Sequence, residues 1–306
     1  MHRQLHLSPP GTNNRSSAQP IPWARAIGRF AAMLVVSATL WQGCSRNSDS
    51  FYYQPEENLL NVVTELYRHF DDDLYRFPYP LDLSGQNLFK ATLVRLANYE
   101  KLHPDRFREE VLYAKGLCYE RLGDYPAAMK NYSEAEAAQN GLTLVAAARR
   151  QKVARLSAIV DANRDRTSLD RYLAELKFQI DDLDALTKDW NDDQDFGPLA
   201  RLEREALQRE RALVLFRNRY VIPDGSRAGL DAAEELIESN PDSRSHYSHL
   251  LMLGDFYSEL AHDYVILYDP ARAEFESDEF DRLVSAAQRL YFEVSEADGY
   301  PEKLEA

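Results

Sequence analysis

Three histidines in the last third of the chain have the residue types and spacing that a metal site would need. His246 and His249 lie one helical turn apart, and His262 is followed directly by Asp263. Imidazole and carboxylate groups at such spacing can bind a transition metal. His246 and His249, however, follow the polar segment Ser-Arg-Ser. A helix that starts there would expose its first residues, including these histidines, to solvent. We therefore expect no metal site and no metal cofactor here.

A second set of candidate ligands is acidic. Asn191, Asp193 and Asp195 alternate as the first ligands of a calcium loop do. The glycine that such a loop requires comes one position late, at Gly197, and the twelfth position is Leu202 instead of a glutamate. The sequence favours a solvated acidic tip between two helices. The run of three aspartates at 71–73 is likewise predicted to be a solvated helix end.

Catalytic chemistry has little support in the residue patterns. Cys118 would need a neighbouring base and an electropositive setting to act as a nucleophile, and we expect it instead to be a small buried apolar residue. The sequence contains no phosphate loop, nucleophile elbow, dinucleotide fingerprint or metalloprotease motif. We predict no catalytic residues, no cofactor and no enzymatic activity.

Charge and cysteine content narrow the classes of partner. The 306 residues carry 50 acidic and 36 basic side chains, a net charge of −14. The first 44 residues hold four arginines and no acid, so the remainder stands at −18. Nucleic acid is an unexpected partner because phosphate binding needs clustered Lys and Arg. Two cysteines cannot form a disulfide framework.

The N-terminal segment 1–44 has the pattern of a signal sequence. Arg25 and Arg29 precede an uncharged, largely apolar run, 30–41, that is about 18 Å long as a helix and too short for the roughly 30 Å bilayer core. The end of this run, Gln42-Gly43-Cys44-Ser45, resembles a bacterial lipoprotein signal. The resemblance departs at Trp41 and Gln42, and the alternatives are an uncleaved anchor, ordinary secretion or a chance pattern.

That resemblance implies cleavage before Cys44 and lipidation of its side chain and new amino group. Two or more acyl chains give a stable membrane anchor. Residues 45–56 are polar and aperiodic and would form a flexible tether. In the family, the absence of an aspartate directly after the cysteine implies an outer-membrane lipoprotein that faces the periplasm of the bacterial cell envelope.

The region 57–306 is predicted to be all-α. Apolar residues recur there at spacings of three and four, and strand-like alternation is scarce. The clearest segment runs from Leu112 to Ala135. Its small residues are Gly116, Gly123, Ala128 and Ala135, and its aromatic residues are Tyr119, Tyr125 and Tyr132. This order resembles a tetratricopeptide (TPR) repeat, with departures at Lys115 and Asn140.

A weaker copy of the same pattern starts at Leu250 and contains Gly254. Its turn is replaced by an insertion over 264–279, after which Ala287 and Tyr291 follow. Either Leu283 or Ala287 could hold the small-residue position. Two helix-then-proline endings, at Pro104 and Pro241, indicate second helices of upstream repeats. We therefore expect a TPR-like helical-repeat solenoid of four or five helix pairs.

The middle of the chain breaks the repeat period. Leu169, Leu173, Leu176, Ile180 and Leu183 form a stripe at spacings of 4, 3, 4 and 3. Thr167 and Asp170 could cap that helix, and Pro198 suits the first turn of the next one. These features predict a long helical hairpin over 167–220, with an intermolecular coiled coil as the alternative, followed by a turn at 221–227.

In TPR proteins the first helix of each repeat lines a groove. Carried onto this sequence, that resemblance places five residues on a partner-binding groove: Glu110, Tyr113, Leu117, Glu120 and Arg121. The alternative is that they form an ordinary exposed face. The predicted function is a membrane-tethered scaffold or adaptor lipoprotein that binds envelope proteins or peptides, with no enzymatic role. The alternatives are a helical solute- or glycan-binding lipoprotein and a structural subunit of a secretion apparatus.

Overall fold

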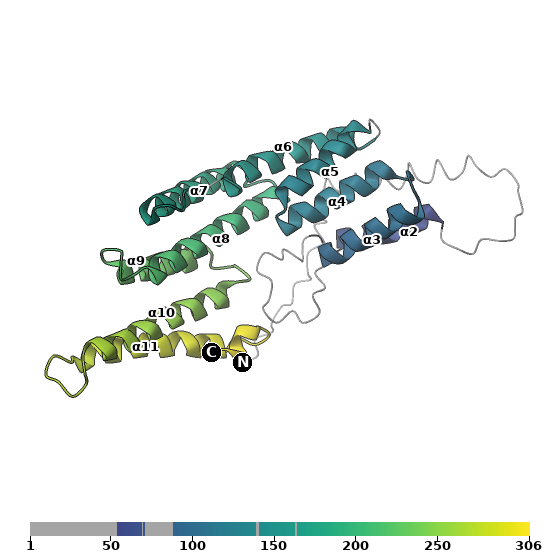
Figure 1. Ribbon diagram of the computed structural model, residues 1–306. Coiled ribbons are helices and arrows are strands. Elements are labelled where there is room, and N and C mark those ends of the chain that lie inside the picture. Colours follow the sequence, from purple (N-terminus) through teal and green to yellow (C-terminus); the bar gives the residue numbers. More distant parts are fainter. Residues whose placement is uncertain (1–53, 69, 71–87, 139–140, 163) are drawn as a thin grey trace, which may run out of the picture. The chain divides into compact units, whose positions relative to one another are not determined.

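The computed structural model describes residues 54–68, 70, 88–138, 141–162 and 164–306 (Figure 1). Over these ranges it contains ten α-helices, one short 3-10 helix and no strand, which confirms the all-α prediction. The described residues belong to one unit, Gln54–Ala306. The predicted signal sequence, Cys44, Asp71–Asp73 and Asn140 lie outside them.

Helices follow one another with short connections. Their bounds are α2 Pro55–Arg68, α3 Leu88–Leu102, α4 Arg108–Leu122, α5 Tyr125–Ala137, α6 Thr143–Val160, α7 Leu169–Asp189, α8 Phe196–Arg217, α9 Gly225–Ser239, α10 His246–Leu267 and α11 Ser277–Ser295, followed by the 3-10 helix Pro301–Leu304. Helix α3 ends just before Pro104 and α9 just before Pro241, as predicted.

Three predicted boundaries shift by a few residues. The last residues of the predicted tether 45–56 belong to α2, because Pro55 suits the first helical turn and two glutamates follow it. Helix α7 starts after Ser168 with no side-chain cap, since Thr167 bonds to Asp165 instead. Helix α9 begins within the predicted turn 221–227, at Gly225.

The two long central helices form an antiparallel hairpin inside the predicted range 167–220. Tyr172 near the start of α7 bonds to Glu210 near the end of α8. Asp184 near the end of α7 pairs with Arg204 near the middle of α8 at 2.9 Å. Helix α7 packs closely on α8 and only slightly on α6, so the regular helix-on-helix succession is interrupted here.

A glycine and a tyrosine interlock α4 with α5. The ring of Tyr132 fills the space where a side chain at Gly116 would be, because a Cβ there would lie 2.5 Å from the Tyr132 Cε1 atom. Gly123 ends α4 in the left-handed conformation with φ 74°, which a residue with a side chain rarely adopts. Ala128 and Tyr125 are fully buried beside them. The small residues of the segment therefore permit a close helix approach.

The same interlock recurs between α10 and α11. A Cβ at Gly254 would lie 2.9 Å from the Tyr291 Cε1 atom. Gly116 and Tyr132 are 16 residues apart, whereas Gly254 and Tyr291 are 37 apart. Both the connection, 268–276 instead of 123–124, and the helices on either side of it are longer in the second pair. Since Tyr291 corresponds to Tyr132, the small residue four positions earlier is Ala287, which resolves the alternative with Leu283.

The buried apolar side chains form two clusters, and α8 belongs to both. Phe196, Leu199 and Leu207 join the cluster that contains α2 to α7. Ala212 and Phe216 join the cluster that contains α9, α10 and α11. The Phe216 ring stacks on Phe256 of α10 with ring centroids 3.8 Å apart. Helix α8 therefore contributes buried residues to both clusters, and Leu173 of α7 also packs against both.

The glycine interlock generates a stability prediction. Gly116→Ala is expected to lower the free energy of unfolding by about 1–3 kcal/mol, because Tyr132 is fully buried and its hydroxyl is fixed on Glu120, so the ring cannot move aside. Urea denaturation followed by circular dichroism measures the change.

Gly141→Ala is the matched control. No atom lies within 4 Å of a Cβ built at Gly141, so this variant is expected to remain within about 0.5 kcal/mol of the original chain. Equal stability of the two variants would contradict the interlock.

Candidate functional site

The five residues predicted to line a groove on α4 do not form an open surface. Tyr113, Leu117, Glu120 and Arg121 are buried, and Glu110 is half-buried. The prediction of an exposed groove at these residues is therefore wrong, because side chains from other segments cover this face of α4. Those segments are the residue Phe70, helix α6 and the connection before α8.

Glu120 makes most of the polar contacts that bury this face of α4. Its carboxylate, fully buried, accepts hydrogen bonds from the Nε and Nη2 atoms of Arg149 on α6, at 3.1 and 2.7 Å. It also accepts one from the Tyr132 hydroxyl at 2.8 Å. The Nη1 atom of Arg149 donates to Asp195 at 2.7 Å. One guanidinium thus joins α4, α6 and the residue that precedes α8.

The electrostatics of this cluster favour a permanently charged arginine. Burial acts to lower the pKa of Arg149, but the neighbouring Glu120 carboxylate outweighs burial and raises that pKa well above its usual value. Burial also raises the pKa of the Tyr132 hydroxyl, and the negative charge of Glu120 adds to this effect. The tyrosine is therefore a neutral donor and the arginine a fixed cation, an arrangement suited to holding helices together.

Arg121 completes the cluster from the neighbouring position. Its guanidinium carbon lies 3.9 Å from the centre of the Phe70 ring, and its Nη2 atom is 3.9 Å from Asp195. The side chain is only 2% exposed. Glu120 and Arg121 are therefore structural in this arrangement, and neither is exposed to a partner.

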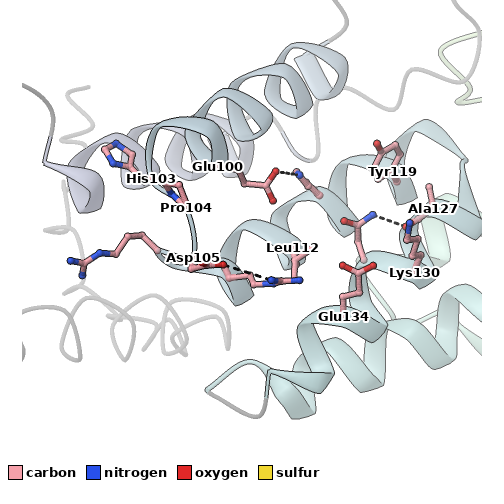
Figure 2. A pocket seen from close by; sticks show the side chains of 13 residues that line it. Glu100, His103, Pro104, Asp105, Leu112, Tyr119, Ala127, Lys130 and Glu134 are labelled. Carbon is pink, nitrogen blue, oxygen red and sulfur yellow. Dashed lines mark hydrogen bonds and ion pairs between the residues drawn. The ribbon is translucent and has the colours of Figure 1, made fainter.

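A cavity opens on a different face of α4. It has a volume of about 520 Å³ and lies among α3, α4, α5 and the α3–α4 connection (Figure 2). Arg108, Leu112, Lys115 and Tyr119 line it from α4 at spacings of 4, 3 and 4, which place them on one stripe of the helix.

The lining of this cavity is mostly charged. Lys115 forms an ion pair with Glu100 of α3. Lys130, Asn131 and Glu134 line it from α5, and the Asn131 side chain donates to the Ala127 carbonyl at 2.8 Å. Together the lining contains four Lys or Arg and three Asp or Glu side chains. Such a cavity could hold a polar or charged group, but it lacks the apolar walls of a typical small-molecule site.

One sequence signal could have indicated this cavity. Lys115 stands where the TPR pattern has a leucine, and in the structure its side chain is 18% exposed and reaches back to Glu100. A leucine there would seal the contact between α3 and α4 with apolar atoms. The departure from the pattern therefore coincides with a polar gap, although the sequence alone does not identify Glu100 as the partner.

The candidate metal ligands have other roles. His249 is fully buried and its Nε2 atom lies 2.7 Å from Glu205, so the expectation that it is solvent-exposed is wrong. His246 is half-buried. Within the part of the chain that the structure describes, no three His, Cys, Asp or Glu side chains are grouped as metal ligands.

The predicted acidic tip is also less solvated than expected. Asp193 forms an ion pair with Lys152 and accepts hydrogen bonds from the backbone N–H groups of Asp195 and Phe196. Burial acts to raise the pKa of Asp193, but the hydrogen bond from Lys152 and those backbone donors outweigh it and lower the pKa. These carboxylates join α6 to the start of α8.

Cys118 is fully buried, as predicted, and burial raises the pKa of its thiol to about 12. The thiol therefore remains protonated at neutral pH and is a poor nucleophile. Cys44, the predicted lipidation site, lies outside the described residues. Among the helices that the structure does describe, none is long and apolar enough to span a membrane.

Comparisons with known proteins do not assign the chain to a family. Neither the models of protein families nor the curated proteins gave a match. The function has therefore to be argued from the residues and their geometry.

The buried cluster generates a second stability prediction. Arg149→Ala is expected to lower the free energy of unfolding by about 3–5 kcal/mol, because Glu120 is left buried without its cation. Adding Glu120→Gln to this variant is expected to recover part of the loss, since a neutral amide costs less to bury than a carboxylate. Chemical denaturation at neutral pH measures the free energy of unfolding of the original chain, of Arg149→Ala and of the double variant.

The next residue on α6 supplies the control. Arg150 pairs with Glu136 at 2.9 Å, but both side chains are about one-third exposed. Arg150→Ala is expected to cost less than about 1 kcal/mol. If the two arginine variants were equally stable, the cluster around Glu120 would not have the structural role assigned to it.

Proposed function

We propose that this chain is a membrane-tethered helical-repeat scaffold, an adaptor lipoprotein that binds other proteins or peptides of the bacterial cell envelope. In this proposal Cys44 carries the lipid, and the helical region is a TPR-like array. The protein is not an enzyme in this proposal. The chain needs no cofactor for such a role.

The main support for the proposal is that the same packing of a tyrosine ring against a glycine occurs in two helix pairs. Gly116 against Tyr132 and Gly254 against Tyr291 repeat the same close helix approach in two helix pairs. In repeat proteins each unit contacts mainly its neighbours, and the exposed faces form extended surfaces for polypeptides. The interrupted packing between α6 and α7 limits the resemblance to the helices on either side.

The glycan-binding alternative receives less support. Such a protein would need a concave cluster of aromatic side chains that shields a small ligand from water. The cavity among α3, α4 and α5 contains one tyrosine, Tyr119, among mostly charged and polar residues. Its charged lining suits contact with a polar polypeptide at least as well as a sugar.

Lipidation is tested by the mass of the mature N-terminus. The full chain, with a C-terminal affinity tag, is expressed in a Gram-negative bacterium and extracted from membranes with a mild detergent. We expect an N-terminal peptide that begins at Cys44 and carries diacylglyceryl and amide-linked acyl groups. Cys44→Ala is expected to abolish this mass, whereas the neighbouring variant Ser45→Ala is expected to retain it.

Partner binding is tested on the same preparation from the native host. Cross-linking before extraction, followed by mass spectrometry, is expected to identify envelope proteins in a fixed ratio to the chain. An unmodified N-terminus that begins before Cys44, together with no protein in fixed ratio, would refute both the lipoprotein and the scaffold proposals.

A further inference from the structure

The region where α8 ends and α10 ends exposes several large apolar side chains. Ile266 and Leu267 are 68% and 72% exposed, and Tyr268 is 43% exposed. Tyr220 and Val221, which follow α8, are 71% and 77% exposed. We call these five residues the apolar patch. Side chains of this size are usually covered, and a group of them indicates an interaction surface.

An ion pair connects the two parts of the patch. Arg219 donates to Asp263 of α10 at 2.8 Å and to the Tyr220 hydroxyl at 3.0 Å. On a helix, Asp263 lies on the same face as the residues three and four positions later, which are Ile266 and Leu267. The Arg219–Asp263 pair therefore brings the residues after α8 close to the end of α10.

The connection between α10 and α11, the loop that joins these two helices in Figure 1, is held by contacts of the Tyr264 side chain. The Tyr264 ring lies 4.8 Å from the Tyr268 ring and 5.5 Å from the Phe275 ring, measured between centroids. The Tyr264 hydroxyl accepts a hydrogen bond from the backbone N–H of Glu276 at 3.1 Å. A preformed surface loses less conformational freedom when it binds a partner.

The surroundings of the patch are strongly acidic. Residues 259–282 contain eight Asp or Glu and two Arg, a net charge of −6. This is one third of the −18 carried by residues 45–306, in less than a tenth of their length. Four of these carboxylates are exposed and form no ion pair with any described residue: Glu274, Glu276, Asp278 and Asp281.

The apolar patch and its acidic surroundings together favour one kind of binding partner over the others. A second copy of the patch would bring two sets of carboxylates together, and an anionic membrane surface would be repelled. A segment that presents apolar side chains between Lys or Arg residues would bury the patch and satisfy the free carboxylates at the same time.

We propose that the apolar patch is the docking surface for a basic amphipathic segment of a partner protein. The proposal rests on the proposed scaffold function, and it adds the place on the chain and the chemistry of the partner segment. The connection of the α10–α11 pair contributes Tyr268 to the patch, and it contains Glu274 and Glu276, two of the four carboxylates without an ion pair to a described residue.

A designed peptide probes this surface directly. The probe is a fluorescein-labelled 18-residue peptide of Leu and Lys in a helical pattern, and its matched control has Glu in place of Lys. Fluorescence anisotropy is recorded against the full chain in mild detergent, with the same detergent alone as background. We expect the Lys peptide to bind, with an affinity that falls as salt rises, and the Glu peptide not to bind.

Substitutions locate the binding. Ile266→Ser with Leu267→Ser is expected to weaken binding of the Lys peptide by about tenfold or more. Leu144→Ser with Val145→Ser is the control, because these neighbours on α6 are also exposed, at 83% and 46%, and lie outside the patch. Neutralising Glu274, Glu276, Asp278 and Asp281 to their amides is expected to reduce the salt dependence.

Three results would overturn the proposal. The first is equal loss of peptide binding, or no loss, in both double-serine variants. The second is equal binding of the Glu peptide. The third is a dimer of the full chain, seen by analytical ultracentrifugation, that the Ile266→Ser and Leu267→Ser changes dissociate, because the patch would then bind a second copy.

The same variant separates this proposal from the scaffold function. If the double-serine variant at 266 and 267 still cross-links its envelope partners in the same ratio, the scaffold function stands and the patch proposal fails. If the original chain captures no partner in fixed ratio but binds the Lys peptide through the patch, the scaffold proposal fails and the recognition chemistry of the patch stands.

Discussion

The buried contact between Arg149 and Glu120 links three helices in the N-terminal half of the described domain. Two opposite charges are buried together there, with the Tyr132 hydroxyl and Asp195 as the other partners of the same groups. A buried carboxylate is tolerated only when its cation and its hydrogen-bond donors are present. Helices α4, α5 and α6 and the start of α8 must therefore dock together for any one of them to be stable.

This packing explains why one face of α4, the face that contains Glu120 and Arg121, is buried. In an open solenoid the residues at Glu120 and Arg121 would face a groove, but here Phe70, Arg149 and Asp195 occupy that side. The polar side chains are used for cohesion between segments. The faces that remain exposed include the cavity lined by the Arg108–Tyr119 stripe and the end of α10.

Much of the architecture could be predicted because it depends on local sequence. The stripe that includes Leu176 and Leu183 gives a helix whose two most central leucines are fully buried. The pattern of Gly116, Gly123 and Tyr132 predicts two helices that are joined by a tight turn and approach each other closely. The structure contains this arrangement. These signals lie within one helix or within one pair of consecutive helices, so residues close together in the chain are enough to show them.

The roles of the polar residues could not be predicted in the same way. Glu120 meets Arg149 29 residues later, and His249 meets Glu205 44 residues earlier. Taken alone, each of these side chains is expected in solvent, since charged residues are rarely buried unless they are paired. The pairing depends on which helices become neighbours, and helical periodicity does not determine this.

The distribution of charge follows from the same distinction between interior and surface. Arg149, Arg121 and Arg219 are each held against carboxylates and aromatic rings inside or between helices. Basic side chains used in this way neutralise interior acids and contribute little to the outer surface. The excess of acid remains where carboxylates have no such partner. Asp263 of α10 is paired with Arg219, whereas Glu274, Glu276, Asp278 and Asp281 after α10 are exposed and form no ion pair with a described residue. An acidic surface of this kind favours contact with groups of the opposite charge.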